Sequence, residues 1–131
     1  MTNEITLTQK QTLAVAAATD LTTLLKPLQK EIFLLDTWIA GTSCITDESV
    51  LDGLRAGDKL ILRREPENRF DDRAVLVLDS ERRKTGYIPE KDNAVFANLM
   101  DAGKFLTAKV ASAAKEGSFY RIRISIYLVD F

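Results

Sequence analysis

The sequence predicts a mainly β fold with short helices, in the form of a small, partly open, six-stranded barrel. Two observations carry this prediction. Six apolar segments with strand character follow residue 30, and the connections between them are too short for repeated βαβ crossovers. At 131 residues with 46% hydrophobic residues, the chain can bury one proper core and fits a single barrel domain with an extension.

Residues 1–30 differ from the rest and are predicted to form an N-terminal helical extension. A first helix begins after Thr8, and a second begins after Asp20, because Thr and Asp side chains cap helix N-termini. Pro27 is expected to end or kink the second helix. The apolar stripe of that helix is Leu21, Leu24, Leu25 and Leu28. The extension serves either as a lid on the β domain, residues 31–131, or as an element for oligomerisation or partner docking.

The predicted strands cover residues 31–41, 59–64, 73–79, 84–88, 105–111 and 119–129. The last strand alternates most clearly. Its even positions, Tyr120, Ile122, Ile124 and Ile126, share one face, and the opposite face carries Arg121, Arg123, Ser125 and Tyr127. Such alternation indicates a strand with one buried face and one face in water.

Two short helices are predicted to interrupt the strands. Residues 48–54 form the first, which ends near Gly57. Residues 92–102 form the second, with Asp92 as its N-cap and Gly103 in the left-handed position after its end.

The composition excludes several kinds of chemistry. With one cysteine, Cys44, and no histidine, the chain can form no internal disulfide and no Ser-His-Asp or Cys-His catalytic group. The usual four-ligand zinc site lacks its ligands as well, so no metal or other cofactor is expected. Neither a secretory signal nor an apolar run of about 20 residues is visible, which predicts a cytoplasmic protein without membrane association.

The charge is nearly balanced but unevenly placed. The net charge is −1, whereas nucleic-acid-binding domains are usually basic. Residues 1–50 hold 3 Lys and Arg against 6 Asp and Glu, and residues 51–131 hold 15 against 13. The C-terminal two-thirds is therefore mildly basic.

The segment Arg64–Val75 is the most informative stretch, because it puts many more polar residues between two strands than a hairpin needs. Asn68, Asp71 and Asp72 can accept hydrogen bonds from nearby backbone amides and so hold a rigid loop. In a purely structural interpretation this loop closes the sheet, and Phe70 plugs the end of the barrel.

In a functional interpretation the rigid loop presents its side chains to a ligand. Arg64, Arg69 and Arg73 can contact phosphates, and Phe70 and Tyr87 can stack on bases. A carboxylate such as Asp71 repels phosphate, but it can accept a hydrogen bond from a hydroxyl group, such as that at a strand end.

Several spaced phrases of the sequence resemble the HIRAN domain family. They are Ile39-Ala40-Gly41-Thr42-Ser43, Gly57-Asp58-Lys59-Leu60, Arg64-Glu65-Pro66 with Asn68, Asp71 and Ala74-Val75, and Gly86-Tyr87-Ile88-Pro89. The helical segment 93–100 followed by Asp101-Ala102-Gly103 fits as well. The resemblance covers about residues 36–130, and its order along the chain makes it specific.

The resemblance implies an OB-like β-barrel that binds nucleic acid without being an enzyme. The family occurs fused to helicase and ubiquitin-ligase regions in DNA-repair proteins and alone in bacteria and phages, and this chain resembles a stand-alone member. In the best understood branch the domain holds the 3′-hydroxyl end of single-stranded DNA and helps to remodel stalled replication forks. The implied partners are a single-stranded 3′ end and a helicase or nuclease.

By position, the resemblance implies that Asn68, Phe70 and Asp71 lie at the terminal nucleotide. Asp71 would accept a hydrogen bond from the 3′-hydroxyl, Phe70 would stack on a base, and Tyr87 would make a further contact. Ser43 and Cys44 stand where that branch has an arginine and an aromatic residue. One lost stacking contact costs about 1–3 kcal/mol, so DNA binding is expected to be weaker by tenfold or more.

Two alternatives to a DNA-binding module remain at this point. The barrel can be a protein-interaction or oligomerisation module whose DNA site has decayed, with the N-terminal helices docking a partner or a second copy. It can also be a hydrolase that holds a divalent metal with Glu65, Asp71, Asp72 and Asp79, although acidic residues in turns usually shape the loop.

Overall fold

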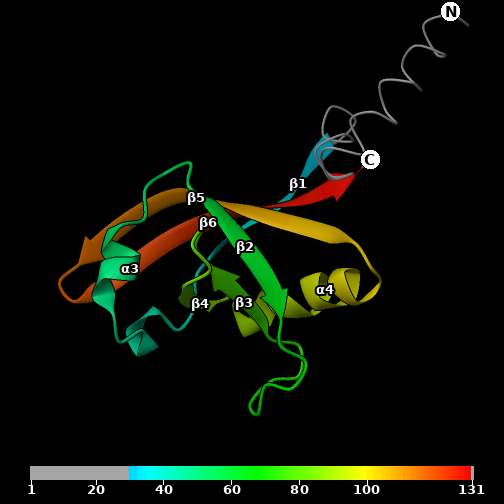
Figure 1. Ribbon diagram of the computed structural model, residues 1–131, viewed down its shortest axis with the longest axis horizontal. Helices are drawn as coiled ribbons and strands as arrows, with labels where there is room; N and C mark the ends of the chain where they lie inside the picture. Colours follow the sequence, from blue (N-terminus) through cyan, green and yellow to red (C-terminus); the bar gives the residue numbers. More distant parts are fainter. Residues whose placement is uncertain (1–29, 131) are drawn as a thin grey trace, which may run out of the picture. The chain divides into compact units, whose positions relative to one another are not determined.

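The computed structural model describes residues 30–130, which form one curled six-stranded sheet with short helices (Figure 1). The strand order is β1-β6-β5-β2-β3-β4, and the pairs β2–β3, β2–β5, β3–β4 and β5–β6 are antiparallel. The strands are β1 (Lys30–Trp38), β2 (Lys59–Arg64), β3 (Val75–Leu78), β4 (Lys84–Tyr87), β5 (Phe105–Glu116) and β6 (Phe119–Asp130). The predicted partly open barrel is confirmed.

The two edge strands of this sheet meet at one point, just after β1. Ala40 and Tyr87 exchange two backbone hydrogen bonds, 2.8 and 2.9 Å long, and so join the end of the β1 segment to β4. The neighbouring position must be glycine, because a Cβ atom on Gly86 would lie 2.4 Å from the Ala40 carbonyl oxygen. This close approach joins the two edges of the curled sheet at one point and so makes it a partly closed barrel.

The core fills the inside of the curled sheet. Alternate residues of β6 are buried, and Ile122, Ile124 and Ile126 are completely enclosed, as their spacing predicted. Helix α4 (Glu90–Asp101) adds Phe96 and Ala97 to the same hydrophobic cluster. Helix α3 (Glu48–Asp52) adds Leu51.

Helix α4 begins two residues earlier than predicted, and Asp92 is not its N-cap. Pro89 is the N-cap residue, and the Asp92 carboxylate instead accepts hydrogen bonds from the Thr37 hydroxyl (2.7 Å) and the Lys91 ammonium group (2.9 Å). Pro89 is suited to this place, because its fixed φ leads into a helix and it has no amide hydrogen to satisfy. At the other end, Gly103 has a φ of +86°, as predicted for the residue after a helix.

Other boundaries differ from the prediction as well; for example, β3 begins at Val75 rather than at residue 73. Strand β1 ends at Trp38 rather than at residue 41, because Gly41 (φ +76°) turns the chain into a short 3-10 helix, η2 (Thr42–Cys44), that the sequence did not predict. Strand β5 continues to Glu116 instead of ending at residue 111, after a bulge between Val110 and Ser112. Its Ala-rich end has weak strand propensity, but it is held by pairing with β6. Helix α3 ends at Asp52, two residues before the predicted end.

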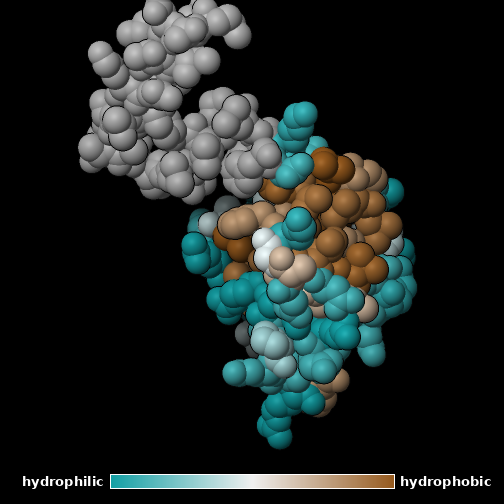
Figure 2. Space-filling view, turned by 90° about the vertical axis from the view of Figure 1, so that its right-hand side faces the viewer, coloured by the Kyte–Doolittle hydropathy of each residue, from teal (hydrophilic) through white to brown (hydrophobic). Residues whose placement is uncertain are grey.

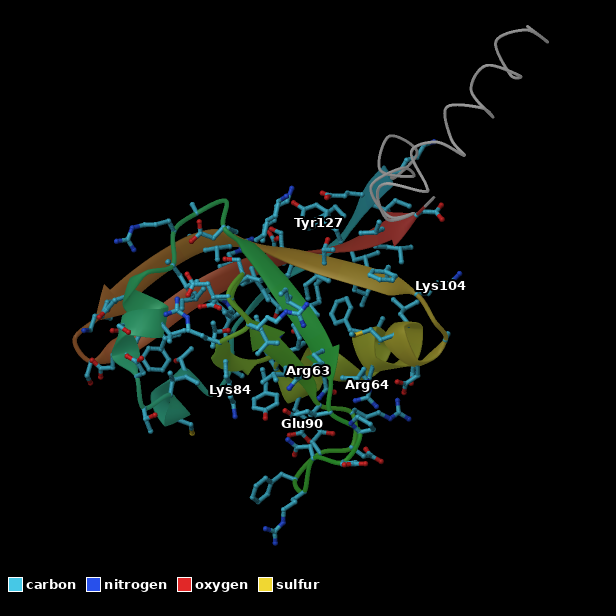
Figure 3. The ribbon with its side chains drawn as sticks, in the orientation of Figure 1. Arg63, Arg64, Lys84, Glu90, Lys104 and Tyr127 are labelled. Carbon is cyan, nitrogen blue, oxygen red and sulfur yellow. The ribbon has the colours of Figure 1, made fainter. Side chains whose placement is uncertain are left out.

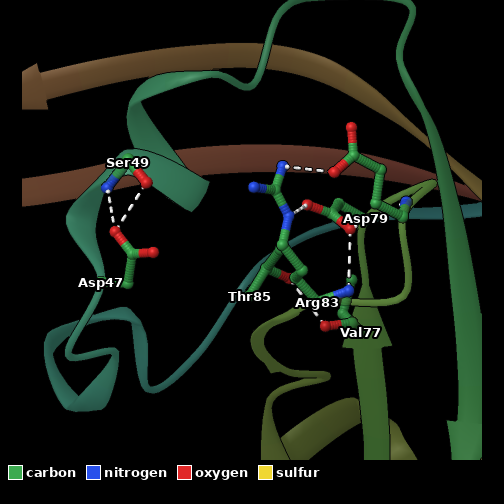
Figure 4. A network of polar contacts seen from close by, with 7 residues as sticks. Asp47, Ser49, Val77, Asp79, Arg83 and Thr85 are labelled. Carbon is green, nitrogen blue, oxygen red and sulfur yellow. Dashed lines mark hydrogen bonds and ion pairs between the residues drawn. The ribbon is translucent and has the colours of Figure 1, made fainter.

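A buried carboxylate shapes the turn between β3 and β4 (Figure 4). Asp79 accepts hydrogen bonds from the backbone amides of Glu81 (2.9 Å) and Arg83 (2.8 Å) and from the Arg83 guanidinium group (2.8 Å). The Thr85 hydroxyl donates to the Val77 carbonyl oxygen across the same hairpin (2.8 Å). Within residues 30–130, the hydrogen-bonding partners of Asp79 all belong to this turn, which gives it a structural role.

The predicted N-terminal helices, and with them the division into residues 1–30 and 31–131, lie largely outside the described residues and stay predictions. Within residues 30–130, neither described α-helix combines the length and the apolar character needed to cross a membrane.

Candidate functional site

The loop between β2 and β3, residues 65–74, projects from the body of the barrel (Figure 1). Arg64 fastens its base. The Arg64 guanidinium group donates to the carbonyl oxygens of Asp72 (2.9 Å) and Ala74 (2.7 Å) and forms a two-pronged ion pair with Asp101 at the end of α4 (2.9 and 3.2 Å). The planar fork of arginine suits such an arrangement. The loop is thereby fixed to both the sheet and the helix.

Asn68 folds the tip of the loop. Its side-chain oxygen accepts hydrogen bonds from the backbone amides of Phe70 (2.9 Å) and Asp71 (3.1 Å). Its side-chain amide donates to Glu65 (3.0 Å). This is the local role that asparagine plays in tight turns. It aims the next residues away from the sheet.

Glu65 connects the loop to β4. One of its carboxylate oxygens, Oε1, accepts hydrogen bonds from Asn68 and from the Tyr87 hydroxyl (2.8 Å). The hydrogen bonds from Asn68 and Tyr87 hold the pKa of the Glu65 carboxyl below its ordinary value. A charged Glu65 thus fixes the position of the Tyr87 ring relative to the loop.

Asp71 is held on both sides. One carboxylate oxygen accepts from the backbone amide of Arg73 (2.9 Å), and the other accepts from the side-chain amide of Asn93 in α4 (2.6 Å). These two hydrogen bonds, the first the stronger influence, lower the pKa of Asp71 from its ordinary value. A carboxylate has about four lone-pair sites, so Asp71 keeps capacity for another donor.

A cavity of about 250 Å³ lies between this loop, the Ala40–Tyr87 pair and the start of α4. Its walls bring together segments far apart in the sequence, namely Ala40, Gly41, Asn68, Phe70, Asp71, Ala74, Tyr87, Ile88, Glu90 and Asn93. Figure 3 shows Glu90 and Arg64 near the base of the loop, with Lys84 on the same side of the molecule. The Lys84 ammonium group lies 4.6 Å from the centre of the Tyr87 ring. The cavity thus combines an apolar floor with a fixed carboxylate and a nearby cation.

The prediction that Phe70 plugs the barrel end is wrong. The Phe70 side chain is 97% exposed, because the turn folded by Asn68 directs it outward. A ring this exposed is not part of the core, and Phe70 is among the residues that line the cavity. The structure therefore leaves the ring free to contact a ligand.

The predicted phosphate-binding arginines differ in their surroundings. The side chain of Arg64 is 13% exposed and its donors bind the protein itself, so we assign it a positioning role. Arg73 donates to Asn98 (2.6 Å), and Arg69 is exposed near the loop tip. Arg121 and Arg123 lie on β6, outside the cavity.

Ser43 and Cys44 lie beside the site rather than in it. Both are exposed on η2, directly after Gly41, which lines the cavity. A ligand that extends from the cavity past Gly41 would meet these two small side chains, where the resemblance leads us to expect an arginine and an aromatic residue.

Sequence reasoning assigned no binding role to Asn93, Glu90, Ala40 and Gly41, which complete the cavity, and considered Glu65 only as a metal ligand. Asn93 is buried and holds Asp71 from a helix 22 positions away in the chain. The available signal was the position of Asn93 on the same helix face as Phe96 and Ala97, because a polar side chain buried there needs a hydrogen-bonding partner. Among residues 30–130, no group of three or more His, Cys, Asp or Glu side chains is placed to hold a metal ion.

The fold and this cavity define a class of protein: a small OB-like barrel domain with a cavity built partly by a loop. The HIRAN domain family model matches residues 32–129, and the chain therefore belongs to the HIRAN domain family, a family of DNA-binding modules. Among curated proteins, none matches the chain significantly.

Two solved structures share the fold. A crystal structure of a protein from Lactobacillus plantarum superposes with a TM-score of 0.73 and 26% identity, covering 79% of this chain and 99% of that chain. The HIRAN domain of human HLTF superposes with a TM-score of 0.60 and 16% identity, covering 76% and 78% of the two chains. The second likeness supports the barrel fold.

The shared carboxylate of Glu65 gives a first prediction. Glu65→Ala leaves Asn68 and Tyr87 without their acceptor, and we expect the free energy of unfolding to fall by about 1 kcal/mol at pH 7. Glu67→Ala, at an exposed neighbour, should change it by less than about 0.5 kcal/mol. Urea unfolding of the full chain measures both.

The same difference should depend on pH in one direction. The folded protein lowers the pKa of Glu65, so its contribution is complete above the ordinary value of 4.5 and is lost as the pH falls through the lowered value. A stability difference between wild type and Glu65→Ala that grows on acidification would contradict this assignment.

Proposed function

We propose that this domain is a non-enzymatic module that binds the 3′ end of single-stranded DNA in the cavity between the loop and Tyr87. The observation that carries the proposal is the Asp71 carboxylate. It lines the cavity, it is fixed by Arg73 and Asn93, and it retains lone pairs for one more donor.

A hydroxyl group is the part of a DNA strand that suits Asp71. Its pKa is lowered, so the group is a carboxylate at neutral pH, and it repels phosphate while accepting a hydrogen bond from an O–H. Only the terminal sugar of a DNA strand offers a free hydroxyl at its 3′ position. The negative charge in the site thus selects strand ends against internal phosphates.

The aromatic rings supply surfaces for the bases. Phe70 is exposed and borders the cavity, and the Tyr87 ring is held by Glu65 with Lys84 close by. Stacking of a base on such a ring contributes about 1–3 kcal/mol without regard to sequence. Asn68 holds the Phe70 and Asp71 amides, and Arg69 and Arg73 supply positive charge for the phosphates.

We place the domain in DNA repair or replication-fork processing in the cytoplasm. A binding domain without catalytic groups depends on a helicase or nuclease partner to act on the strand end it holds. The small side chains of Ser43 and Cys44 on η2 reduce its affinity compared with a site that carries an arginine and an aromatic there.

The end-recognition proposal predicts a strong effect of the strand terminus. A fluorescent single strand with a 3′-hydroxyl should bind at least tenfold more tightly than the same strand with a 3′-phosphate, because the phosphate loses the hydrogen bond to Asp71 and is repelled by it. Asp71→Asn should reduce this preference, since it removes the charge but keeps the shape. Fluorescence anisotropy at two salt concentrations measures both.

Asp72→Asn is the matched control, because Asp72 is the exposed neighbour and its side chain does not line the cavity. It should keep the preference for the 3′-hydroxyl. Equal affinity of the wild type for the two termini would remove the end-recognition proposal.

One observation favours a second function, a protein-interaction module that pairs with a second copy of itself. An apolar groove of about 360 Å³ lies between β1 and α4 and includes Leu34, Leu35, Val95 and Leu99. Figure 2 shows apolar side chains gathered on the face of the molecule where α4 lies in Figure 1. Strand β1 is also an edge strand of the described sheet, and an open edge can pair with another chain. Oligomerisation is also one of the two uses considered for the helices predicted in residues 1–30.

Light scattering on the full chain tests this function. If the groove joins two copies, the wild type has twice the mass of one 14.6 kDa chain, and Val95→Glu restores the single mass because it puts a charge into the apolar interface. Lys104→Glu, an exposed position outside the groove, should leave the dimer intact. A wild-type mass of one chain would exclude pairing through this groove.

A further inference from the structure

The aromatic surface of the barrel continues beyond the cavity. We propose that Trp38, together with Arg121, forms a second stacking position for nucleotides that lie beyond the two at the 3′ end. This inference rests on the proposed function, because it extends the path of the same single strand.

The register of the strands places Trp38 on the path out of the cavity. Ala40 and Tyr87 are directly paired, and directly paired residues carry their side chains on the same face of a sheet. Trp38 precedes Ala40 by two residues and therefore shares that face, about 7 Å further along the segment. A strand leaving the cavity past Tyr87 and Ala40 thus meets Trp38 next.

The indole ring is held in place and is still accessible. Its exposed fraction is 42%, and the Arg121 guanidinium carbon lies 4.9 Å from the ring centre. The Ile39 amide donates to the Ile122 carbonyl oxygen (2.9 Å) and so joins the segment after Trp38 to β6. The two side chains form one unit across neighbouring strands.

A hollow of about 230 Å³ lies beside this pair and is lined by Trp38, Ile39, Phe119, Tyr120, Arg121 and Ile122. Phe119 is 53% exposed, so the hollow has aromatic side chains from β1 and from β6. Two exposed aromatic rings with an arginine between apolar walls are a composition that suits an unstacked base.

Arg121 can also bind a phosphate there. The ion pair that it forms with Glu116 is long at 4.0 Å, and both side chains are about half exposed or more. An exposed pair of that length contributes little, so a phosphate can replace the carboxylate at small cost. Arginine presents its donors in a fork that matches a phosphate group.

The positive charge of Arg121 and its place beside the Trp38 ring together favour a nucleic-acid strand as the occupant. A single strand repeats a flat base and a phosphate at each step, and Trp38 and Arg121 offer one contact for each. OB-folds that bind single strands contact roughly 4–16 nucleotides each, and a cavity of about 250 Å³ is too small for that many. The Trp38 position thus adds a contact to those that the cavity provides.

Trp38 is the single tryptophan of the chain, so its emission reports this position alone. We expect an eight-nucleotide strand with a 3′-hydroxyl to quench the emission, because the base stacks on the indole. A dinucleotide with the same terminus fills only the cavity and should leave the emission unchanged.

Substitution gives an independent readout by anisotropy competition. Trp38→Ala should weaken binding of the eight-nucleotide strand by about five- to a hundredfold, the loss of one stacked base, and should leave dinucleotide binding unchanged. Trp38→Phe keeps a stacking ring and should recover most of the affinity. Phe105→Ala removes an exposed aromatic ring at the start of β5 and serves as the control for general surface effects.

The outcomes separate this inference from the proposed function. If the eight-nucleotide strand binds in an Asp71-dependent way while the emission and the Trp38→Ala affinity stay at wild-type values, the second position is wrong and the cavity stands. If the wild type binds neither strand, both proposals fail.

Discussion

The paired backbones of Ala40 and Tyr87 are the constraint on which the rest of the structure depends. This pair joins the two edge segments of the sheet. It requires a glycine at position 86, because the two backbone segments lie so close together that a Cβ atom there would collide with Ala40. It also brings the Gly41 turn, the Tyr87 ring and the β2–β3 loop to one place. Closure of the barrel and assembly of the cavity are thus the same event, and a change that weakens the pair would affect both.

The polar groups around the cavity divide into those that hold the loop and those that remain available. The first group is Arg64, Asn68 and Glu65, whose hydrogen bonds lie within the protein and fix the loop to the sheet and to α4. The second group is Asp71, which can accept a further hydrogen bond, and Phe70, whose ring is exposed. The pKa values of the Glu65 and Asp71 carboxyls are both lowered, so both groups stay charged and keep these hydrogen bonds at neutral pH. A site of this kind is pre-formed, and a ligand would not have to order it.

Much of this was predictable from the sequence, and the remainder has identifiable causes. Period-two alternation indicated β6 and its buried face, and the phrases around Asn68 and Tyr87 indicated the family. The role of Phe70 in the barrel end was wrong, because an aromatic residue in a loop looks like a core residue until the hydrogen bonds of Asn68 are known. Asp92 looked like a helix cap, but its partner Thr37 is 55 positions away in the chain. Asn93 likewise holds Asp71 across 22 positions. Sequence patterns report local structure well and such distant partners poorly.

The most direct test of the account is a nuclear magnetic resonance titration of the full chain, labelled with nitrogen-15, with a single strand that ends in a 3′-hydroxyl. The account predicts that the largest changes fall on the backbone amides of Gly41, Phe70, Asp71 and Tyr87 and on the side-chain amide of Asn93, and that a strand with a 3′-phosphate produces much smaller ones. Changes confined to the groove residues Leu35 and Val95, or equal changes with both strands, would contradict it.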